Sequence, residues 1–427
     1  MALAHGRMDT PSSHRMLGHL GPIGGRERIA LLDVVRGFTL YGVLLANTVP
    51  WFSGHGLLPK AEAAARIGTG DEIAFFFLTV FVSRKSQTLL TCLFGLGFAI
   101  QLARAEGRAG RLYLRRLAIL LVIGVCHAAF VWWGDVLAGY ALCGGALILF
   151  HRRSDRALLA WATVLVFVPK FVTSVPAVSA FLDRVTAAAF DRAAFDAELL
   201  LACRGDDYAL LVKTQAARAL YYFLSHAPEY IPWMIGHFLV GFLVGRRRAL
   251  ETTTSHLARW RQVLAWSAGL GLAGGTLSAA KGIYLRRGGA LSTAWKMALI
   301  VPEEVGILAM ALAYVSGLVL LMHNSSWRPR IIRLAPAGQM ALTTYLLQSV
   351  IMTFVFYGWG LGLLLRVGPA WCIPLTLAVF GAQIAFAAAW LRRFYFGPVE
   401  WVWRYLTYGK APRMRRSAPD LAAAPQR

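Results

Sequence analysis

Residues 29–50 read IALLDVVRGFTLYGVLLANTVP, a run of 22 residues that carries only two charged side chains, Asp33 and Arg36. A stretch of about 20 apolar residues can cross the hydrocarbon core of a bilayer as one helix. Similar runs recur throughout the 427 residues, of which 57% are hydrophobic and 15% are charged. This composition indicates one polytopic membrane domain rather than a water-soluble enzyme.

The apolar runs predict an all-α transmembrane bundle of about ten helices. They lie at residues 29–50, 72–103, 113–133, 136–151, 157–175, 228–245, 262–280, 300–322, 335–357 and 369–391. Arg84 and Lys85 interrupt the second run. It therefore forms either one long helix or an interfacial helix followed by a span.

The charge distribution predicts the orientation. Lys and Arg number 44 against 21 Asp and Glu, a surplus that would suggest nucleic acid binding in a soluble protein. Here the basic residues form short clusters between apolar runs. With the N-terminus inside, 28 of them face the cytoplasm and 12 lie in external loops. We therefore expect both ends inside, in the cytoplasmic membrane of a bacterium, with the bilayer as partner and no nucleic acid.

Five segments follow from this topology. Residues 1–27 form a cytoplasmic tail without the apolar core of a signal peptide. Residues 28–175 form a first transmembrane half that holds most buried polar residues, and residues 176–227 an external segment of two surface helices. A second transmembrane half spans residues 228–393. An interfacial aromatic and basic segment with a cytoplasmic tail occupies residues 394–427.

Ionisable groups at membrane depth are costly and usually functional. Asp33 and Arg36 stand three residues apart on one helix face, where they can pair. They form either a structural ion pair or, through Arg36, a contact to the phosphate of a cytoplasmic donor. Lys85 adds another buried cation, and Asn47 and Gln348 add buried amides that bind substrate or bond between helices.

His127 and Asp135 are the strongest catalytic candidates. They lie at the facing ends of two adjacent predicted helices, where the carboxylate can orient the imidazole as a base. A lone histidine in a bundle is more often a structural residue, and that alternative stays open. His55, in the loop after the first span, is a second candidate base, although an exposed loop histidine is the simpler interpretation. No HExxH-type spacing occurs, so we predict no metal site.

Glycines recur on two predicted helices. Gly95 and Gly97 lie on the second helix, and Gly236, Gly241 and Gly245 lie on the sixth. Small residues at such positions let helix backbones approach closely in a membrane. We expect these glycines to mark helix contacts.

Six strings together resemble the YeiB-like family of bacterial membrane proteins, which carry the domain of unknown function 418. They are LDVVRG at 32–37 followed by Asn47, Lys85 ten residues before Gly95, RRL at 115–117, His127 followed by GDVLAGYAL at 134–142, GQMALTTYLLQS at 338–349, and GPVEWVWR at 397–404. The resemblance covers about residues 28–410. It implies a multi-pass protein of the bacterial inner membrane.

The first of these strings is also similar to the start of the transmembrane acyltransferase group, whose members move acyl groups from cytoplasmic acyl-CoA to sugars. That resemblance implies a donor site at Asp33, Arg36 and Lys85. In the acyltransferase-3 branch a His stands eleven residues after the matching arginine, whereas this chain has Asn47. The heparan glucosaminide acetyltransferase branch is similar to this chain in placing Asn there.

Two functional hypotheses follow. The first is a membrane-bound O- or N-acyltransferase. It uses acyl-CoA as co-substrate without a tightly bound cofactor, with His127, oriented by Asp135, or His55 as base. Asn47 and Gln348 then contact an acceptor, which is an envelope glycan or a small molecule.

The alternative is a transporter or exporter of a small polar or anionic solute that binds the same buried residues. A non-catalytic scaffold is a third reading, and the oligomeric state is left open.

Overall fold

The computed structural model describes residues 30–104, 109–189, 191–250 and 256–417. Within these ranges every regular element is a helix, apart from an isolated antiparallel bridge between Phe394 and Arg415. The all-α prediction is confirmed. The predicted tail at residues 1–27 lies outside the described residues.

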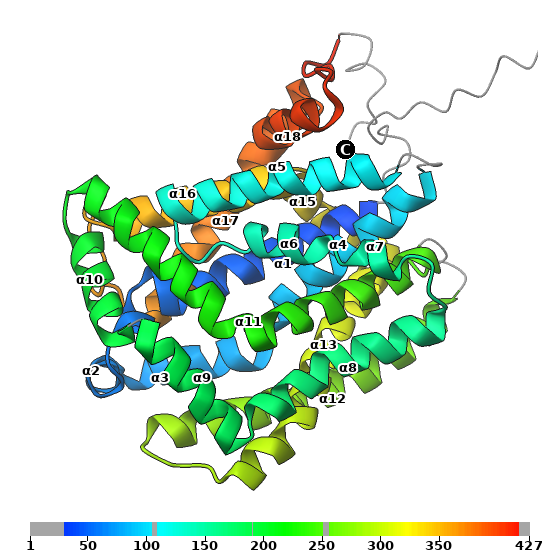
Figure 1. Cartoon of the computed structure of the whole chain (residues 1–427). Coiled ribbons are helices and arrows are strands. Elements are labelled where there is room, and N and C mark those ends of the chain that lie inside the picture. Colours follow the sequence, from blue (N-terminus) through cyan, green and yellow to red (C-terminus); the bar gives the residue numbers. More distant parts are fainter. Residues whose placement is uncertain (1–29, 105–108, 190, 251–255, 418–427) are drawn as a thin grey trace, which may run out of the picture.

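The helices pack side by side as a bundle (Figure 1). Their bounds are α1 Ala30–Asn47, η2 Thr48–Phe52, η3 His55–Leu57, α2 Lys60–Arg66, α3 Thr69–Phe77, η4 Leu78–Val82, α4 Lys85–Arg104, α5 Ala109–Phe130, α6 Leu137–Gly144, α7 Leu147–Phe150, α8 Asp155–Thr173, α9 Pro176–Ala189, α10 Arg192–Arg204, α11 Tyr208–Arg246, α12 Leu257–Arg286, α13 Thr293–His323, α14 Arg328–Ile331, η6 Ile332–Leu334, α15 Ala335–Gln339, α16 Ala341–Phe356, α17 Pro369–Arg393 and α18 Pro398–Tyr408.

Seven helices in the described part of the chain are long and apolar enough to cross a membrane. An eighth span results if the pair 328–339 and 341–356, bent by 82°, is one crossing. The predicted spans at 136–151 and 228–245 correspond to the short α6–α7 segment and to the second half of the 39-residue α11. The count of ten and the inside orientation of both ends stay predictions.

The outer surface of the bundle is apolar. Trp266, Leu149 and Trp371 are 78%, 75% and 72% exposed. Such exposure would be unfavourable in water over a continuous surface, and it suits a surface in contact with lipid tails. The apolar side chains outside the bundle therefore agree with a multi-pass membrane protein.

Helix α1 runs through the middle of the bundle (Figure 1). Val34, Leu40 and Leu44 on it are at most 1% exposed. It contacts α4, α13, α15, α16 and α17. The polar residues of α1 therefore face protein rather than lipid.

Glycines bring α4 and α11 together, as predicted. A Cβ atom at Gly95 would collide with the carbonyl of Phe238, and one at Gly241 with the carbonyl of Cys92. Gly245 is crowded by Ala99 and Leu96 of α4, whereas Gly236 packs against α8. Gly97 has nothing within 4 Å of an added Cβ, so the prediction was wrong for this glycine.

Two irregular segments interrupt the bundle. Arg84 adopts a left-handed conformation, with φ of 64°, and separates η4 from α4. The second apolar run is thus broken at the predicted place. Residues 131–136 form a turn that carries the buried Trp132 and Trp133. The predicted external segment contains α9 and α10, but residues 208–227 belong to α11, which continues through Pro228 and Pro232.

Candidate functional site

His127 and Asp135 form a buried pair. Nδ1 of His127 lies 2.8 Å from Oδ1 of Asp135, and both side chains are 2% exposed. The second carboxylate oxygen accepts the backbone N–H of Ala138 at 2.8 Å, in the first turn of α6. The carboxylate is therefore held at two points, as an orienting group must be.

The pairing fixes the tautomer of the imidazole. A carboxylate only accepts hydrogen bonds, so the Nδ1 atom of His127 carries the proton. In the neutral imidazole Nε2 then carries the lone pair. In the described part of the chain Nε2 of His127 is buried and has no hydrogen-bond partner. A buried nitrogen with a free lone pair and an oriented ring is the arrangement of a general base.

The turn at residues 131–136 places Asp135 against α5. The backbone N–H groups of Val131 and Trp132 donate to the carbonyl of His127 at 2.9 and 2.8 Å. A Cβ atom at Gly124 would lie 2.8 Å from Asp135 Oδ2 and would collide with the amide nitrogen of Ala138. The absence of a side chain at Gly124 therefore lets the carboxylate reach the histidine one turn further along α5.

Helix α16 lines the other side of this pair. The ring of Tyr345 lies 5.4 Å from that of His127, and its hydroxyl is 3.4 Å from the amide nitrogen of Val136. Gln348, three residues later, is buried and donates to the carbonyl of Leu40 at 3.3 Å. Gln348 thus links α16 to α1, and its role in substrate binding stays a prediction.

His55 is buried, with 6% of its surface exposed, so the exposed-loop interpretation was wrong. Ser53 donates its hydroxyl to the carbonyl of Val49 at 2.6 Å, and Nδ1 of His55 lies 3.0 Å from the same hydroxyl oxygen. Because that hydroxyl proton is used, Nδ1 is the donor in this second bond. Burial lowers the pKa of His55. Asn47 is half-buried at the end of α1.

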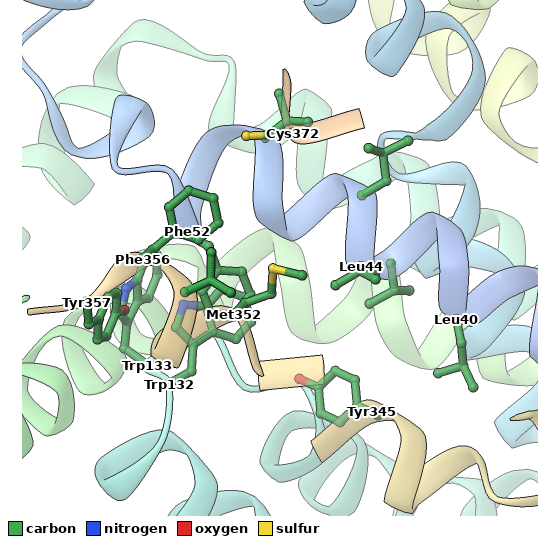
Figure 2. Packing of buried hydrophobic residues seen from close by; sticks show 14 of the residues in the cluster. Leu40, Leu44, Phe52, Trp132, Trp133, Tyr345, Met352, Phe356, Tyr357 and Cys372 are labelled. Carbon is green, nitrogen blue, oxygen red and sulfur yellow. The ribbon is translucent and has the colours of Figure 1, made fainter. Parts of the chain in front are cut away.

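Aromatic rings connect the loop of His55 to the turn of Asp135. Phe52 stacks on Trp132 with ring centroids 4.3 Å apart, and Trp51 meets Trp133 edge to face at 5.4 Å. Figure 2 shows Phe52, Trp132 and Trp133 together with Phe356 and Tyr357. The two candidate bases therefore belong to one end of the bundle.

Asp33 and Arg36 lie near the start of α1, toward the opposite end. The guanidinium of Arg36 lies 3.2 Å from the carboxylate of Asp33, so the predicted pairing is confirmed. α15 lies tight against this turn, because a Cβ at Gly37 would collide with the Leu334 carbonyl and one at Gly338 with that of Asp33. Close helix packing positions this pair.

Arg116 and Arg404 join Arg36 at this end of the bundle. The charge of Arg116 interacts with those of Arg36 and Arg404. Its guanidinium stacks on the ring of Trp403 at 4.0 Å, and the indole of Trp403 donates to the Arg116 carbonyl at 3.1 Å. Sequence reasoning missed this grouping, because basic clusters at helix ends were assigned to topology alone. Guanidinium groups are well suited to bind phosphate.

Lys85 belongs to a different site. A Cβ at Gly42 would collide with the hydroxyl of Ser86, so the start of α4, which carries Lys85, packs beside Gly42 rather than beside Arg36. Gly42 stands six residues after Arg36 on α1, which is roughly 9 Å along the helix axis. The ammonium of Lys85 is 2% exposed and donates to the carbonyl of Thr79.

The surroundings of Lys85 are strongly charged. The buried carboxylate of Glu304 pairs with Arg84 and Lys170 at 2.6 Å each and accepts the indole N–H of Trp233 at 3.3 Å. Glu303 pairs with Lys281. This charged group carries a surplus of two positive charges. Its four cations and two carboxylates are Arg84, Lys85, Lys170, Lys281, Glu303 and Glu304. Glu303 and Glu304 were missed, although two adjacent carboxylates in an apolar run of this kind are a usable signal.

Comparison with known proteins identifies the family. The chain is 30% identical over 411 residues to YxaH of Bacillus subtilis (strain 168), described as uncharacterized, which covers 92% of this chain and 97% of the relative. The chain belongs to the YeiB-like family. The model of the DUF418 family, a protein family of unknown function, matches residues 244–410.

A second YeiB-like relative is YeiB itself from Escherichia coli (strain K12), 29% identical over 419 residues, with 89% of this chain and 96% of the relative covered. No solved structure matches the chain. The DUF418 match includes α16 and α18, with Tyr345, Gln348 and Arg404. The His127–Asp135 pair precedes it, in a part of the chain that the two relatives cover.

Proposed function

We propose that the protein is an integral membrane acyltransferase that moves an acyl group from cytoplasmic acyl-CoA to a hydroxyl or amine on the external side. The acceptor is an envelope glycan or a small molecule. The observation that carries the proposal is the His127–Asp135 pair, with its buried, unpartnered Nε2. An imidazole held in this way supplies a base where the bundle excludes bulk water.

The chemistry is that of acyl transfer. Nε2 of His127 removes the proton of the acceptor hydroxyl or amine, whose oxygen or nitrogen attacks the thioester carbonyl. The carbon–sulfur bond then breaks, and the CoA thiolate takes the proton from the imidazolium. Asp135 stabilises the imidazolium in between. The products are the acylated acceptor and free CoA.

The donor site lies at the other end of the bundle. Arg36, Arg116 and Arg404 gather there and suit the phosphates of CoA. Arg116 and His127 stand on the same helix, eleven residues apart, which is roughly 16 Å. An extended pantetheine arm can bridge that distance. In the predicted orientation this places CoA at the cytoplasmic face of a bacterial inner membrane.

Acetyl-CoA binding to the detergent-purified protein tests the donor site by calorimetry. We expect binding by the wild type and at least ten-fold weaker binding by Arg116→Gln and Arg36→Gln. Arg333→Gln is the control, because Arg333 is an exposed arginine between α14 and α15. Absence of binding by folded wild-type protein would contradict the proposal.

A second candidate function is transport of a small anion. It is favoured by the helix break at Arg84, beside which the group of four cations and two carboxylates lies. Broken helices with buried charge form the solute sites of many transporters. Uptake of phosphate or acetate by proteoliposomes, lost in Lys85→Met, together with no acetyl-CoA binding, would favour this function over acyl transfer.

A further inference from the structure

Four buried side chains beside the His127–Asp135 pair hold hydrogen-bond donors without acceptors. Trp132, Trp133, Gln215 and Arg218 are 1%, 3%, 0% and 2% exposed. The indole N–H groups of both tryptophans, the amide nitrogen of Gln215 and Nη1 of Arg218 have no partner in the described part of the chain. An unsatisfied buried donor costs about 1–3 kcal/mol, so four in one place need an explanation.

These side chains lie next to one another. The ring centroids of Trp132 and Trp133 are 5.8 Å apart. Figure 2 shows the two side chains from close by. The guanidinium carbon of Arg218 lies 4.7 Å from the ring centroid of Trp133. The amide nitrogen of Trp133 donates to Oε1 of Gln215 at 3.1 Å. The four donors therefore belong to one site, formed by the turn at residues 131–136 and by α11.

The four side chains offer donors, and the acceptors described beside them, Oε1 of Gln215 and the carboxylate of Asp196, are already engaged. Indole and guanidinium groups donate only, and the oxygen of Gln215 is already used by Trp133. A ligand with hydroxyl groups would bring donors of its own that need acceptors. A carboxylate or a phosphate group only accepts, and one such group can satisfy several donors at once.

The charge of the site also favours an anion. Arg218 Nε lies 2.8 Å from the carboxylate of Asp196, which also contacts Arg192 at 3.4 Å. Two guanidinium groups thus share one carboxylate, which leaves one positive charge. Because the side chain of Arg192 is 65% exposed, the positive end of this group reaches the surface.

We propose that Trp132, Trp133, Gln215 and Arg218 bind an oxyanion, a carboxylate or phosphate group of the molecule that is acylated. The backbone N–H of Trp132 donates to the His127 carbonyl at 2.8 Å, so the site adjoins the end of α5 that carries the base. The assignment to the acceptor rests on the proposed function, whereas the oxyanion site rests on the donors alone. The oxyanion belongs either to a free solute or to a lipid headgroup.

The indole N–H resonances of the protein report on this site directly. We would record them for 15N-tryptophan-labelled protein in phosphatidylcholine nanodiscs. The chain has 14 tryptophans, and Trp132→Phe and Trp133→Phe each assign one resonance by its loss. Sodium phosphate and sodium acetate are the probes, with sodium chloride at matched ionic strength as the reference.

We expect the resonances of Trp132 and Trp133 to shift and saturate with phosphate or acetate, and Gln215→Leu to weaken the binding at least five-fold. The resonance of Trp266, which is 78% exposed, serves as the control and should not move. A shift without added anion in phosphatidylglycerol nanodiscs would identify the lipid as the source. Resonances that stay unmoved by either anion and by the anionic lipid, in folded protein, would overturn the proposal and leave water as the partner.

The outcome is independent of acyl transfer. Anion binding in a protein that transfers no acyl group would keep the site and remove the proposed function. Acyl transfer without anion binding at the two tryptophans would keep the function and remove the site.

Discussion

The imidazole of His127 and the carboxylate of Asp135 lie 2.8 Å apart inside the bundle, although α5 ends between them. The chain turns back at residues 131–136, and the missing side chain of Gly124 leaves room for the carboxylate. Asp135 also accepts from the backbone of α6. The pair is therefore fixed by the local fold, and its free nitrogen is the feature on which the proposed chemistry depends.

Gly95 and Gly97 make a matched pair of tests for helix packing. Gly95→Ala should destabilise the protein by about 1–3 kcal/mol, because the new methyl group would collide with the Phe238 carbonyl. Gly97→Ala meets open space and should be neutral or stabilising by up to about 1 kcal/mol, since alanine is the better helix former. Unfolding in dodecyl sulfate measures both. Equal losses would contradict the close contact of α4 with α11.

Glu400 should stabilise the start of α16. Its carboxylate accepts the backbone N–H groups of Leu342 and Thr343 at 2.7 and 3.0 Å and the hydroxyl of Thr343 at 2.5 Å. Glu400→Ala leaves these donors unpaired and should lower the free energy of unfolding by about 1–3 kcal/mol. Glu62→Ala removes an exposed pair and should change it by at most about 0.5 kcal/mol. Similar losses in both variants would exclude the capping role.

Glu304 should be far more sensitive than its neighbour. Glu304→Gln removes the counter-charge of both Arg84 and Lys170, which should cost about 3–5 kcal/mol. Glu303→Gln removes the partner of Lys281, whose side chain is 30% exposed, and should cost less. The yield of folded protein and its denaturant midpoint measure the difference. A tolerant Glu304 would show that the cations find other partners.

His55 should make stability depend on pH. Burial lowers its pKa in the folded state, so the unfolded chain binds more protons below its ordinary pKa of about 6.5. The folded state therefore loses stability as the pH falls through that range. His55→Gln should flatten this part of the profile. Thermal midpoints at pH 7.5, 6.5 and 5.5 measure the effect, and an unchanged slope would show that His55 titrates normally.

The sequence predicted the helical class and the contact of His127 with Asp135, for simple reasons. Apolar runs of bilayer length specify helices, and a short connection brought His127 and Asp135 within reach. The number of spans was harder to predict. Residues 208–227 carry charge and read as a surface segment, yet they extend α11 because Pro228 and Pro232 do not end it.

The remaining site residues depend on contacts between distant parts of the chain. Arg116 meets Trp403 across 287 residues of sequence, and Gln215 on α11 meets Trp133 in the turn at residues 131–136. Neither position has a local pattern that sets it apart from other arginines or amides. Glu304 shows the same limit, because its partners are Arg84, in the break between η4 and α4, and Lys170, on α8.

Inverted membrane vesicles from an overexpressing bacterium report directly on acyl transfer by His127. They expose the cytoplasmic face and carry their own envelope acceptors. With radiolabelled acetyl-CoA outside, we expect label in non-CoA products, reduced about 10²–10⁴-fold by His127→Gln. His323→Gln, at the end of α13, should keep the wild-type rate. Equal labelling by wild type and His127→Gln would contradict the account.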